Sequence, residues 1–457
     1  MTTTSARLQR NLVRPRTWPL RAGDLYALVI ANGLVIAAMW VRHGGLDELA
    51  TTAGAITAAG QLTALLGTDG ALLGLVLMSR SPWLDQTLGP DRLTSAHRWI
   101  GFATVWLLLA HGLLTTIGWA MIDGRPVVDE AWLLLTTYPF ILMTVAGTGL
   151  FVTVGVSSVR AARRRLSYET WHGIHLYAYL AMALTFAHQL VLGTDFVGDP
   201  IARIYWSGLY AAAIALVVAF RVGAPIRLSV HHRFRVANVV TEAPGVISVY
   251  VAGRDLASLP ARAGQFFQWR FLARDGWWRA HPYSLSAAPN GEWLRLTAKD
   301  LGDDSRRLGA LSIGTAVFAE GPYGILTGAR RTRRRVLLIA GGIGITPLRA
   351  LLEELPGGPG DLTLIYRAKR PGDIVFRDEL DAIARLRGAT IHYVVGRRGR
   401  DVPPDPLGPA AIRQFAPDVA DRDIYVCGPD QMMVAVLDSL RALRVPESRI
   451  HAERFEH

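Results

Sequence analysis

Four histidines in the N-terminal half of the chain have a type and spacing suited to metal binding. His97 and His111 are 14 residues apart, which at about 100° and 1.5 Å per residue places them within about 40° of one helix face and about 21 Å apart. His175 and His188 are 13 residues apart on a second apolar segment. Imidazoles that meet across two helices at two levels are the axial ligands that two stacked b-type haems require. The pattern therefore predicts a two-haem site.

The spacing of the second pair conflicts with a straight helix. Thirteen residues advance an ideal helix by about 220° beyond whole turns, so His175 and His188 do not share a face. Replacing His175 with His172 leaves about 160° and does not remove the conflict. We therefore expect a bulge or local unwinding between the two ligands, with His172 as an alternative to His175. In the other interpretation, these histidines only make hydrogen bonds to neighbouring helices.

A segment in the C-terminal half has the composition of a flavin site. Its residues, at an expected strand end, are His281, Pro282, Tyr283 and Ser284. A flat isoalloxazine needs a backbone strand, an aromatic platform and a small hydroxyl near its reactive nitrogen, and this segment offers all three. Downstream, Lys299, Gly302 and Ser305 lead into a short helix whose N-terminal amides suit a pyrophosphate. The alternative for this turn is a simple helix cap.

Two further segments have the composition of a nicotinamide-nucleotide site. A loop that follows a buried strand and opens a helix contains Gly341, Gly342, Gly344, Thr346 and Pro347. Its glycines let the backbone approach a pyrophosphate at the helix N-terminus. The second segment ends a later strand and consists of Cys427, Gly428 and Pro429. Arg367, and after it Arg397, are placed to meet a 2′-phosphate, which favours NADPH over NADH.

The composition indicates which elements position these residues. The chain has 457 residues, of which 51% are hydrophobic and 19% charged, and the apolar residues concentrate before residue 224. Six segments there are long enough, at about 20 residues, to cross a bilayer core of roughly 30 Å. We place these spans at residues 24–41, 56–78, 97–121, 132–156, 171–192 and 203–222. The N-terminal half is therefore expected to be a membrane α-helical bundle.

Charge sets the expected orientation of the bundle. Arginines concentrate in the arm of residues 1–23 and in every second loop, which predicts that both termini are cytoplasmic in a multi-pass plasma-membrane protein. The formal net charge of +12 therefore reflects these loops, and no nucleic-acid partner is expected. The single cysteine, Cys427, excludes an internal disulfide, a four-cysteine iron–sulfur cluster and a covalently attached C-x-x-C-H haem.

The rest of the chain divides into two expected domains. Residues 226–328 contain short alternating runs between Pro/Gly turns, which predicts an antiparallel β-barrel. Residues 333–457 alternate buried strands with helices, which predicts an α/β Rossmann-like domain with a parallel sheet. Together with the arm and the six-span region of residues 24–223, this gives four parts.

The order of these segments resembles the superfamily of ferric reductases and NADPH oxidases over about residues 20–457. The resemblance implies a six-span haem domain fused to a ferredoxin–NADP reductase-type module. It implies that the two histidine pairs hold two b haems and that the 13-residue spacing is tolerated. It also implies that residues 281–284 bind FAD and that the glycine loop and the C-G-P segment bind the nicotinamide nucleotide. A terminal aromatic stacks on the flavin in this family, a role implied here for Phe455.

One departure from the family pattern concerns the pyrophosphate of FAD. Soluble relatives have an arginine where this chain has His281, so the contact comes either from Arg279 or from the turn at residues 302–305.

These implications combine into an expected function. NADPH delivers hydride to FAD in the cytoplasm, and electrons pass over the two haems to a ferric chelate or oxygen across the membrane. Ser284, Cys427 and Phe455 are the expected catalytic residues. An extracytoplasmic redox protein or a quinone is an alternative acceptor. A flavin reductase anchored by a haem-free bundle is the alternative function, and it requires the histidines to be structural.

Overall fold

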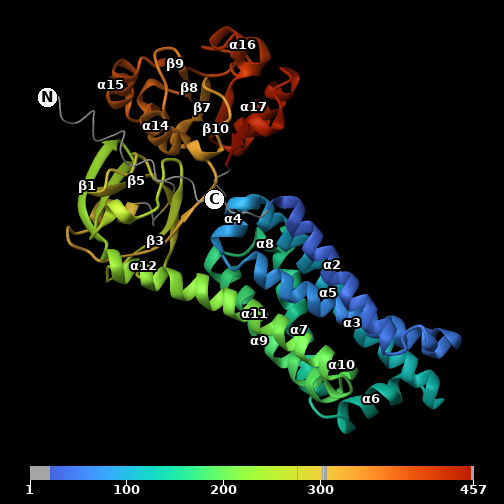
Figure 1. The fold of residues 1–457 in the computed structure, drawn as a ribbon. Coiled ribbons are helices and arrows are strands. Elements are labelled where there is room, and N and C mark those ends of the chain that lie inside the picture. The colour runs from blue at the N-terminus through green and yellow to red at the C-terminus, as the bar shows by residue number, and fades with distance from the viewer. Residues whose placement is uncertain (1–20, 275, 301, 303–305, 454–457) are drawn as a thin grey trace. The chain divides into compact units, whose positions relative to one another are not determined.

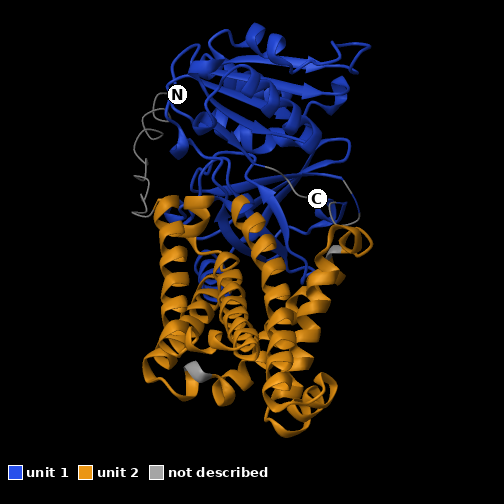
Figure 2. Ribbon diagram, turned by 90° about the vertical axis from the view of Figure 1, so that its right-hand side faces the viewer, with its two compact units in different colours: residues 1–18, 89–91, 222–457 blue, residues 19–88, 92–221 orange. Residues whose placement is uncertain are grey.

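The computed structural model describes residues 21–274, 276–300, 302 and 306–453. The chain divides into two compact units (Figure 2). The helical unit comprises residues 19–88 and 92–221, and the second unit contains residues 222–457. Most of the expected arm, along with Ser305 and Phe455, lies outside the described residues.

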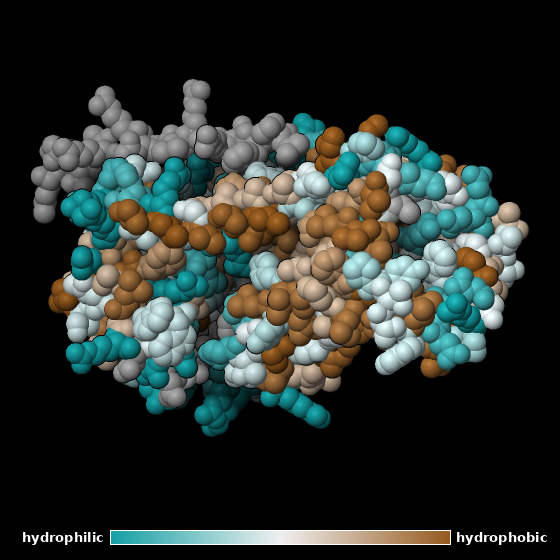
Figure 3. All heavy atoms as spheres, turned by 90° about the horizontal axis from the view of Figure 1, so that it is seen from below, coloured by the Kyte–Doolittle hydropathy of each residue, from teal (hydrophilic) through white to brown (hydrophobic). Residues whose placement is uncertain are grey.

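Six helices among the described residues are long and apolar enough to cross a membrane, as predicted. They are α2 (Ala22–Arg42), α3 (Thr52–Leu77), α5 (Pro90–Asp123), α7 (Ile141–Ser158), α9 (Tyr168–Leu192) and a helix over Pro200–His232 (Figure 1). Many of their large apolar side chains are exposed, including Leu34, Leu142 and Ile204. Figure 3 shows hydrophobic residues, in brown, gathered in broad patches on the face viewed. Lipid is the environment that suits such a surface.

The fourth span differs from the prediction of one helix over residues 132–156. A shorter helix, α6 (Val127–Thr137), ends before Pro139, and α7 begins only at Ile141. Proline disfavours helical backbone in the residue before it, and Tyr138 is extended. Phe140 then adopts a left-handed conformation with φ of 65°. The break therefore follows from the proline.

The sixth span continues beyond the predicted boundary near residue 224. It consists of α11 (Pro200–Val217), a π-helical segment (Val218–Gly223) and α12 (Ala224–His232). Pro225 lacks a backbone N–H, and the wider turns directly before it accommodate the missing hydrogen bond. In the second unit, Ser229 of α12 bonds the backbone of Ala319, which attaches this helix to the barrel described next.

The first part of the second unit is the predicted antiparallel barrel. One sheet has the order β1 (Arg235–Ala243), β2 (Val246–Ala252), β5 (Trp293–Lys299), and the other has the order β4 (His281–Ser284), β3 (Phe266–Phe271), β6 (Val317–Tyr323). Bridges between Arg235 and Ala316 and between Leu285 and Leu296 join the two sheets. Phe267, Trp269 and Leu296 are fully buried between them.

The remainder of the second unit is a parallel-sheet lobe, as predicted. Its strand order is β11 (Ile450–Ala452), β10 (Asp423–Cys427), β7 (Val336–Gly341), β8 (Leu362–Ala368), β9 (Thr390–Val395). Helices α14 (Ile345–Glu354) and α15 (Arg377–Arg387) contribute to the core on one face, and α16 (Pro409–Phe415) and α17 (Asp430–Ala442) to the core on the other. Because β7, β8 and β10 are parallel, their carboxyl ends form one edge, where such sheets bind ligands.

Candidate functional site

The four predicted histidines meet in two pairs between α5 and α9. The ring centroids of His97 and His175 are 5.9 Å apart, and those of His111 and His188 are 6.4 Å apart. An iron bound between two imidazole nitrogens at about 2 Å each separates the ring centroids by roughly 6 Å. Both pairs therefore have the spacing that a haem iron between them requires.

Hydrogen bonds fix which nitrogen of each ring is available to a metal. Each Nδ1 has a partner: the Gly74 carbonyl at 3.2 Å for His97, the Gly60 carbonyl at 3.0 Å for His111, Ser158 Oγ at 3.5 Å for His175, and Thr144 Oγ1 at 2.9 Å for His188. The two hydroxyls donate their own protons to the carbonyls of Val154 and Phe140, so they accept from the rings. These partners assign the proton to each Nδ1, which leaves Nε2 as the nitrogen that could bind a metal.

The prediction of local unwinding between His175 and His188 is wrong. Helix α9 runs from Tyr168 to Leu192 without a bulge. The two pairs differ instead in ring geometry, because the ring planes cross at 66° in the His97 pair and at 26° in the His111 pair. Both α9 rings nevertheless reach their α5 partners from one regular helix. His172, the alternative ligand, is exposed, and the structure places His175 opposite His97.

Close packing of small residues holds these helices at the required separation. A Cβ on Gly67 of α3 would lie 2.9 Å from Leu108 of α5, and a Cβ on Gly147 of α7 would lie 2.9 Å from the Ala181 carbonyl oxygen of α9. Small residues let membrane helices approach closely. Helices α3 and α7 are thus near enough to α5 and α9 to supply the Nδ1 acceptors. Among the described residues, no three His, Cys, Asp or Glu side chains form a group that could hold an ion by themselves.

The predicted flavin segment forms β4 and pairs with β3. Tyr283 lies opposite Phe267 in the register, and Ser284 lies opposite Phe266. Because side chains alternate along a strand, Tyr283 shares a face with His281, and their ring centroids are 6.1 Å apart. Pro282 and Ser284 point to the other face of the strand, where Pro282 is exposed and Ser284 is buried. The expected aromatic platform and hydroxyl are therefore on opposite faces of the strand.

The turn after β5 is described only in part. Lys299 ends β5 and is half-buried. The backbone N–H of Gly302 donates to Asp300 Oδ1 at 3.1 Å, as in a side-chain-stabilised turn. This geometry fits the helix-cap interpretation as well as it fits the pyrophosphate-binding interpretation.

The glycine loop lies against the C-G-P segment at the carboxyl edge of the sheet. A Cβ on Gly344 would be 2.4 Å from the Cys427 carbonyl oxygen, so only glycine fits there. Gly342 has a φ of 54° and open space where a Cβ would be, which leaves its backbone approachable. Tyr366 donates to the Gly342 carbonyl at 3.1 Å, and Thr346 donates to the Ile343 carbonyl at 3.0 Å. These two hydrogen bonds fix the carbonyl groups of Gly342 and Ile343 at the start of α14.

Cys427 and Glu453 are buried near each other at the same edge. Burial raises the pKa of the Cys427 thiol well above its usual range, and the nearby Glu453 adds to this shift. Burial also raises the pKa of Glu453 to about 8. Its Oε1 has no hydrogen-bond partner among the described residues and lies 2.8 Å from where a Cβ on Gly324 would be. Both groups are therefore protonated at neutral pH. Our sequence reasoning missed Glu453.

Arg367 is not oriented as the sequence suggested. Its guanidinium is buried and donates to the backbone carbonyls of Ala368, Val394 and Gly396, which ties β8 to β9. Arg397, by contrast, is exposed after β9. The described structure therefore leaves Arg397, rather than Arg367, accessible to a phosphate.

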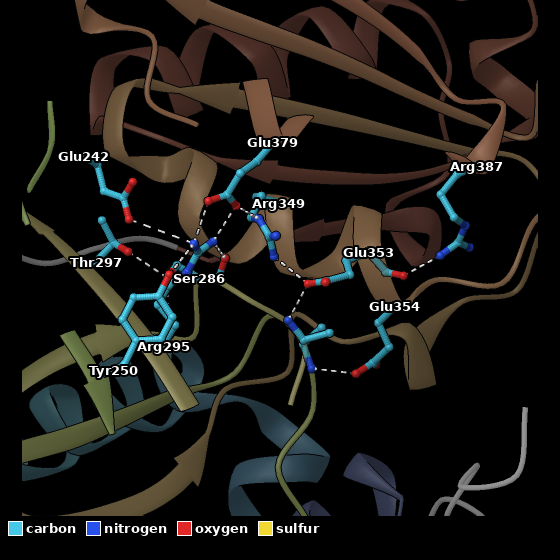
Figure 4. Close-up of polar contacts among 12 residues, drawn as sticks. Glu242, Tyr250, Ser286, Arg295, Thr297, Arg349, Glu353, Glu354, Glu379 and Arg387 are labelled. Carbon is cyan, nitrogen blue, oxygen red and sulfur yellow. Dashed lines mark hydrogen bonds and ion pairs between the residues drawn. The ribbon is translucent and has the colours of Figure 1, made fainter. Parts of the chain in front are cut away.

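A network of charged residues built on two buried arginines joins the barrel to the parallel-sheet lobe (Figure 4). Arg295 of β5, only 2% exposed, bonds both carboxylate oxygens of Glu379 in α15 at 2.8 and 2.9 Å. It also donates to the Ser286 carbonyl at 2.9 Å, two residues after the flavin segment. Arg349 of α14 donates to the same Glu379 at 2.8 Å.

The next residues of α14 extend this connection. Glu353 accepts from the backbone N–H of Ala288 at 2.8 Å, and Glu354 accepts from that of Ala263 at 3.0 Å. The helix that follows the glycine loop is thus bonded directly to the barrel segment that follows Ser284. Sequence reasoning did not identify these residues, because they are ordinary surface types until the two domains meet.

Two parts of the chain match protein families. Residues 63–186 match the family described as ferric reductase like transmembrane component, and residues 338–438 match the oxidoreductase NAD-binding domain. These matches cover part of the helical unit and most of the parallel-sheet lobe. The first contains His97, His111 and His175 and ends two residues before His188, and the second contains the glycine loop and the C-G-P segment.

Individual relatives match part of the chain. Ferredoxin–NADP reductase B of Sorangium cellulosum is 30% identical over 188 residues, which cover 38% of this chain and 77% of the relative. A flavohemoprotein of Chromobacterium violaceum is 31% identical over 252 residues, or 49% of this chain and 60% of the relative. The match thus spans less than two thirds of that second protein.

Among solved structures, the FAD/NAD-binding domain of a nitric oxide dioxygenase from Vibrio cholerae is 24% identical, with a TM-score of 0.40. The match covers 49% of this chain and 99% of that one.

Proposed function

Because the chain belongs to the ferredoxin–NADP reductase family and carries a ferric reductase-like transmembrane component, we propose that it conducts electrons from NADPH through FAD and two b-type haems to an acceptor across the membrane. NADPH supplies a hydride, FAD divides the electron pair, and haem iron carries single electrons. The protein residues bind and position these groups. The acceptor is a ferric chelate or oxygen.

The two histidine pairs are the observation that supports the haem proposal most strongly. His97 and His175 would hold one iron through Nε2, and His111 and His188 would hold the other. Their spacings of 5.9 and 6.4 Å and their four Nδ1 hydrogen bonds fit bis-imidazole ligation. The 14-residue spacing of the α5 ligands separates the two levels by about 21 Å along the helix. The pairs thus form two steps across the bundle.

The second unit binds the two nucleotides. Gly342 and Gly344 place the glycine loop so that the start of α14 receives the pyrophosphate of NADPH. Ser284 and Cys427 line the path of the hydride, and the buried Glu453 holds a proton at its carboxyl beside Cys427. Both termini lie in the cytoplasm, as the arginine-rich loops favour.

Replacing His111 tests this order of transfer. In the purified full-length protein, His111→Ala should abolish electron transfer to ferric citrate or oxygen yet leave NADPH-dependent flavin reduction intact. The matched control is His172→Ala, which removes an exposed histidine of α9 and should change neither rate. Stopped-flow absorbance follows flavin reduction, and steady-state assays with each acceptor follow the overall reaction. Loss of flavin reduction in His111→Ala, or an unchanged acceptor rate, would contradict the proposal.

A further inference from the structure

Helix α3 contains one charged residue, Asp69, well inside the span. The helix runs from Thr52 to Leu77, and Asp69 is its only Asp, Glu, Lys or Arg. Ionisable side chains inside a membrane are costly and are usually paired or functional. Asp69 plays no part in the histidine pairs, so its presence needs a separate explanation.

Asp69 ends a chain of hydrogen bonds across three helices. Asn32 of α2 donates from Nδ2 to Asp69 Oδ1 at 2.7 Å. Tyr205 of α11 donates its hydroxyl proton to Asn32 Oδ1 at 2.6 Å. The amide of Asn32 is therefore oriented from both sides, and all three groups are half-buried. The network presents a fixed donor to the carboxyl group.

The groups that face Asp69 do not include a positive charge. The elements that pack on α3 include α2, which presents the neutral Asn32, and α11, which presents Tyr205. Arg203 of α11 is exposed, and Glu48 bonds Gln61, eight residues earlier on α3. Among the described residues, no Arg, Lys or His forms an ion pair with Asp69. Any charge on this carboxylate is therefore uncompensated by a neighbouring side chain.

Asp69 lies at a depth between the two histidine pairs. The α3 carbonyl that His97 bonds belongs to Gly74, and the one that His111 bonds belongs to Gly60. Asp69 is five residues from the first and nine from the second, or about 7 and 13 Å along the axis. A charge at this position acts on both pairs through a medium of low dielectric constant.

We propose that Asp69 is a proton-binding site whose occupancy follows the electrons carried by the haems proposed at the two histidine pairs. Asp69 binds one proton from water when an electron derived from NADPH arrives, forming the O–H bond of the neutral acid. It releases that proton when the electron leaves for the acceptor. The proton charge offsets the electron charge, and the Tyr205–Asn32 chain holds the carboxyl group in place. This inference rests on the haem function proposed above.

The test compares the midpoint potentials of the haems at several pH values in the full-length protein in lipid nanodiscs. The wild-type potentials should fall as pH rises, and Asp69→Asn should lose at least half of that slope while retaining both haems. The matched control, Tyr210→Phe, removes a neutral 3.3 Å bond to Gln189 in the same bundle and should keep the wild-type slope. In redox-induced infrared difference spectra, a protonated carboxyl band should appear on reduction and be missing in Asp69→Asn.

Outcomes separate the two proposals. Two haems with the same pH slope in wild type and Asp69→Asn would overturn the proton site and leave the electron path intact. A wild-type protein without haem would overturn both. If Asp69→Asn fails to fold, Tyr205→Phe keeps the acid and removes the donor to Asn32. This variant should move the pH range in which the potential changes, and an unmoved range would overturn the proposal.

Discussion

Replacing Glu379 with glutamine perturbs the network that joins the barrel to the parallel-sheet lobe. Glu379 receives two hydrogen bonds from Arg295 and one from Arg349 (Figure 4). Glutamine has a similar shape but no charge, so both guanidinium groups lose their shared carboxylate. Arg295 keeps its bond to the Ser286 carbonyl and its position 4.6 Å from the Phe376 ring centroid.

The magnitude follows from the burial of the two partners. Breaking a fully buried ion pair by removing one partner costs about 3–5 kcal/mol. The Glu379 side chain is 37% exposed, so water screens part of this interaction, and glutamine retains one acceptor. We therefore expect the free energy of unfolding of the second unit to fall by about 2 kcal/mol. The control is Asp438→Asn, which breaks an exposed pair with Arg441 and should cost at most about 0.5 kcal/mol.

The contribution of Glu379 to the free energy of unfolding should also depend on pH, and the direction of its pKa shift sets the sign of that dependence. Burial raises the pKa of Glu379, but the hydrogen bond and charge of Arg295, with the help of Arg349, outweigh burial and hold the pKa below its ordinary value. A carboxyl group with a lowered pKa stabilises the fold above its ordinary pKa, and this contribution disappears as pH falls through the lowered value.

Urea unfolding of the full-length protein, followed by flavin fluorescence, measures the difference between wild type and Glu379→Gln at each pH. The difference should be largest at neutral pH and vanish in acid. A difference that is absent at neutral pH, or constant into acid, would refute the role of this ion pair.

Three further predictions concern the sites. Gly344→Ala places a methyl group against the C-G-P backbone, so it should lower the free energy of unfolding by about 1–3 kcal/mol and raise the KM for NADPH. The control Gly372→Ala, at an open position, should change neither quantity. Thermal melting and steady-state assays measure the two effects. Because the raised pKa of Glu453 is about 8, stability should fall as pH rises through that value, and melting temperatures of Glu453→Gln should lack this loss. His175→Ala should bind one haem fewer per chain than wild type, while His172→Ala should bind the full complement, as the pyridine haemochrome assay of haem content would show.

Features that depend on local composition were predictable from the sequence. Apolar segments longer than a bilayer core indicated the six spans, and strand alternation indicated the barrel. The pairing of His97 with His175 followed from matched depth on two spans of the same direction. Pro139 was also visible in the sequence, and its effect on the fourth span could have been predicted.

Features that depend on long-range packing were not predictable in the same way. The prediction of a bulge in α9 was wrong because the helical period fixes the direction of each Cβ atom but not the position of the imidazole ring beyond it. Arg367 bonds the Val394 carbonyl of β9, a strand that begins 23 residues later in sequence. Glu453 is buried directly after β11, a short strand whose pairing with β10 joins residues about 26 positions apart in sequence. The Asp69 network joins residues from three separate spans.

The most direct test of electron transfer through two bis-histidine haems is the absorption spectrum of the purified full-length protein, recorded anaerobically before and after NADPH is added. Two haems per chain should be present as low-spin species, and the Soret and α bands should shift to those of the reduced form in the wild type. A protein that oxidises NADPH and reduces its flavin but shows no haem absorbance would contradict the proposed function.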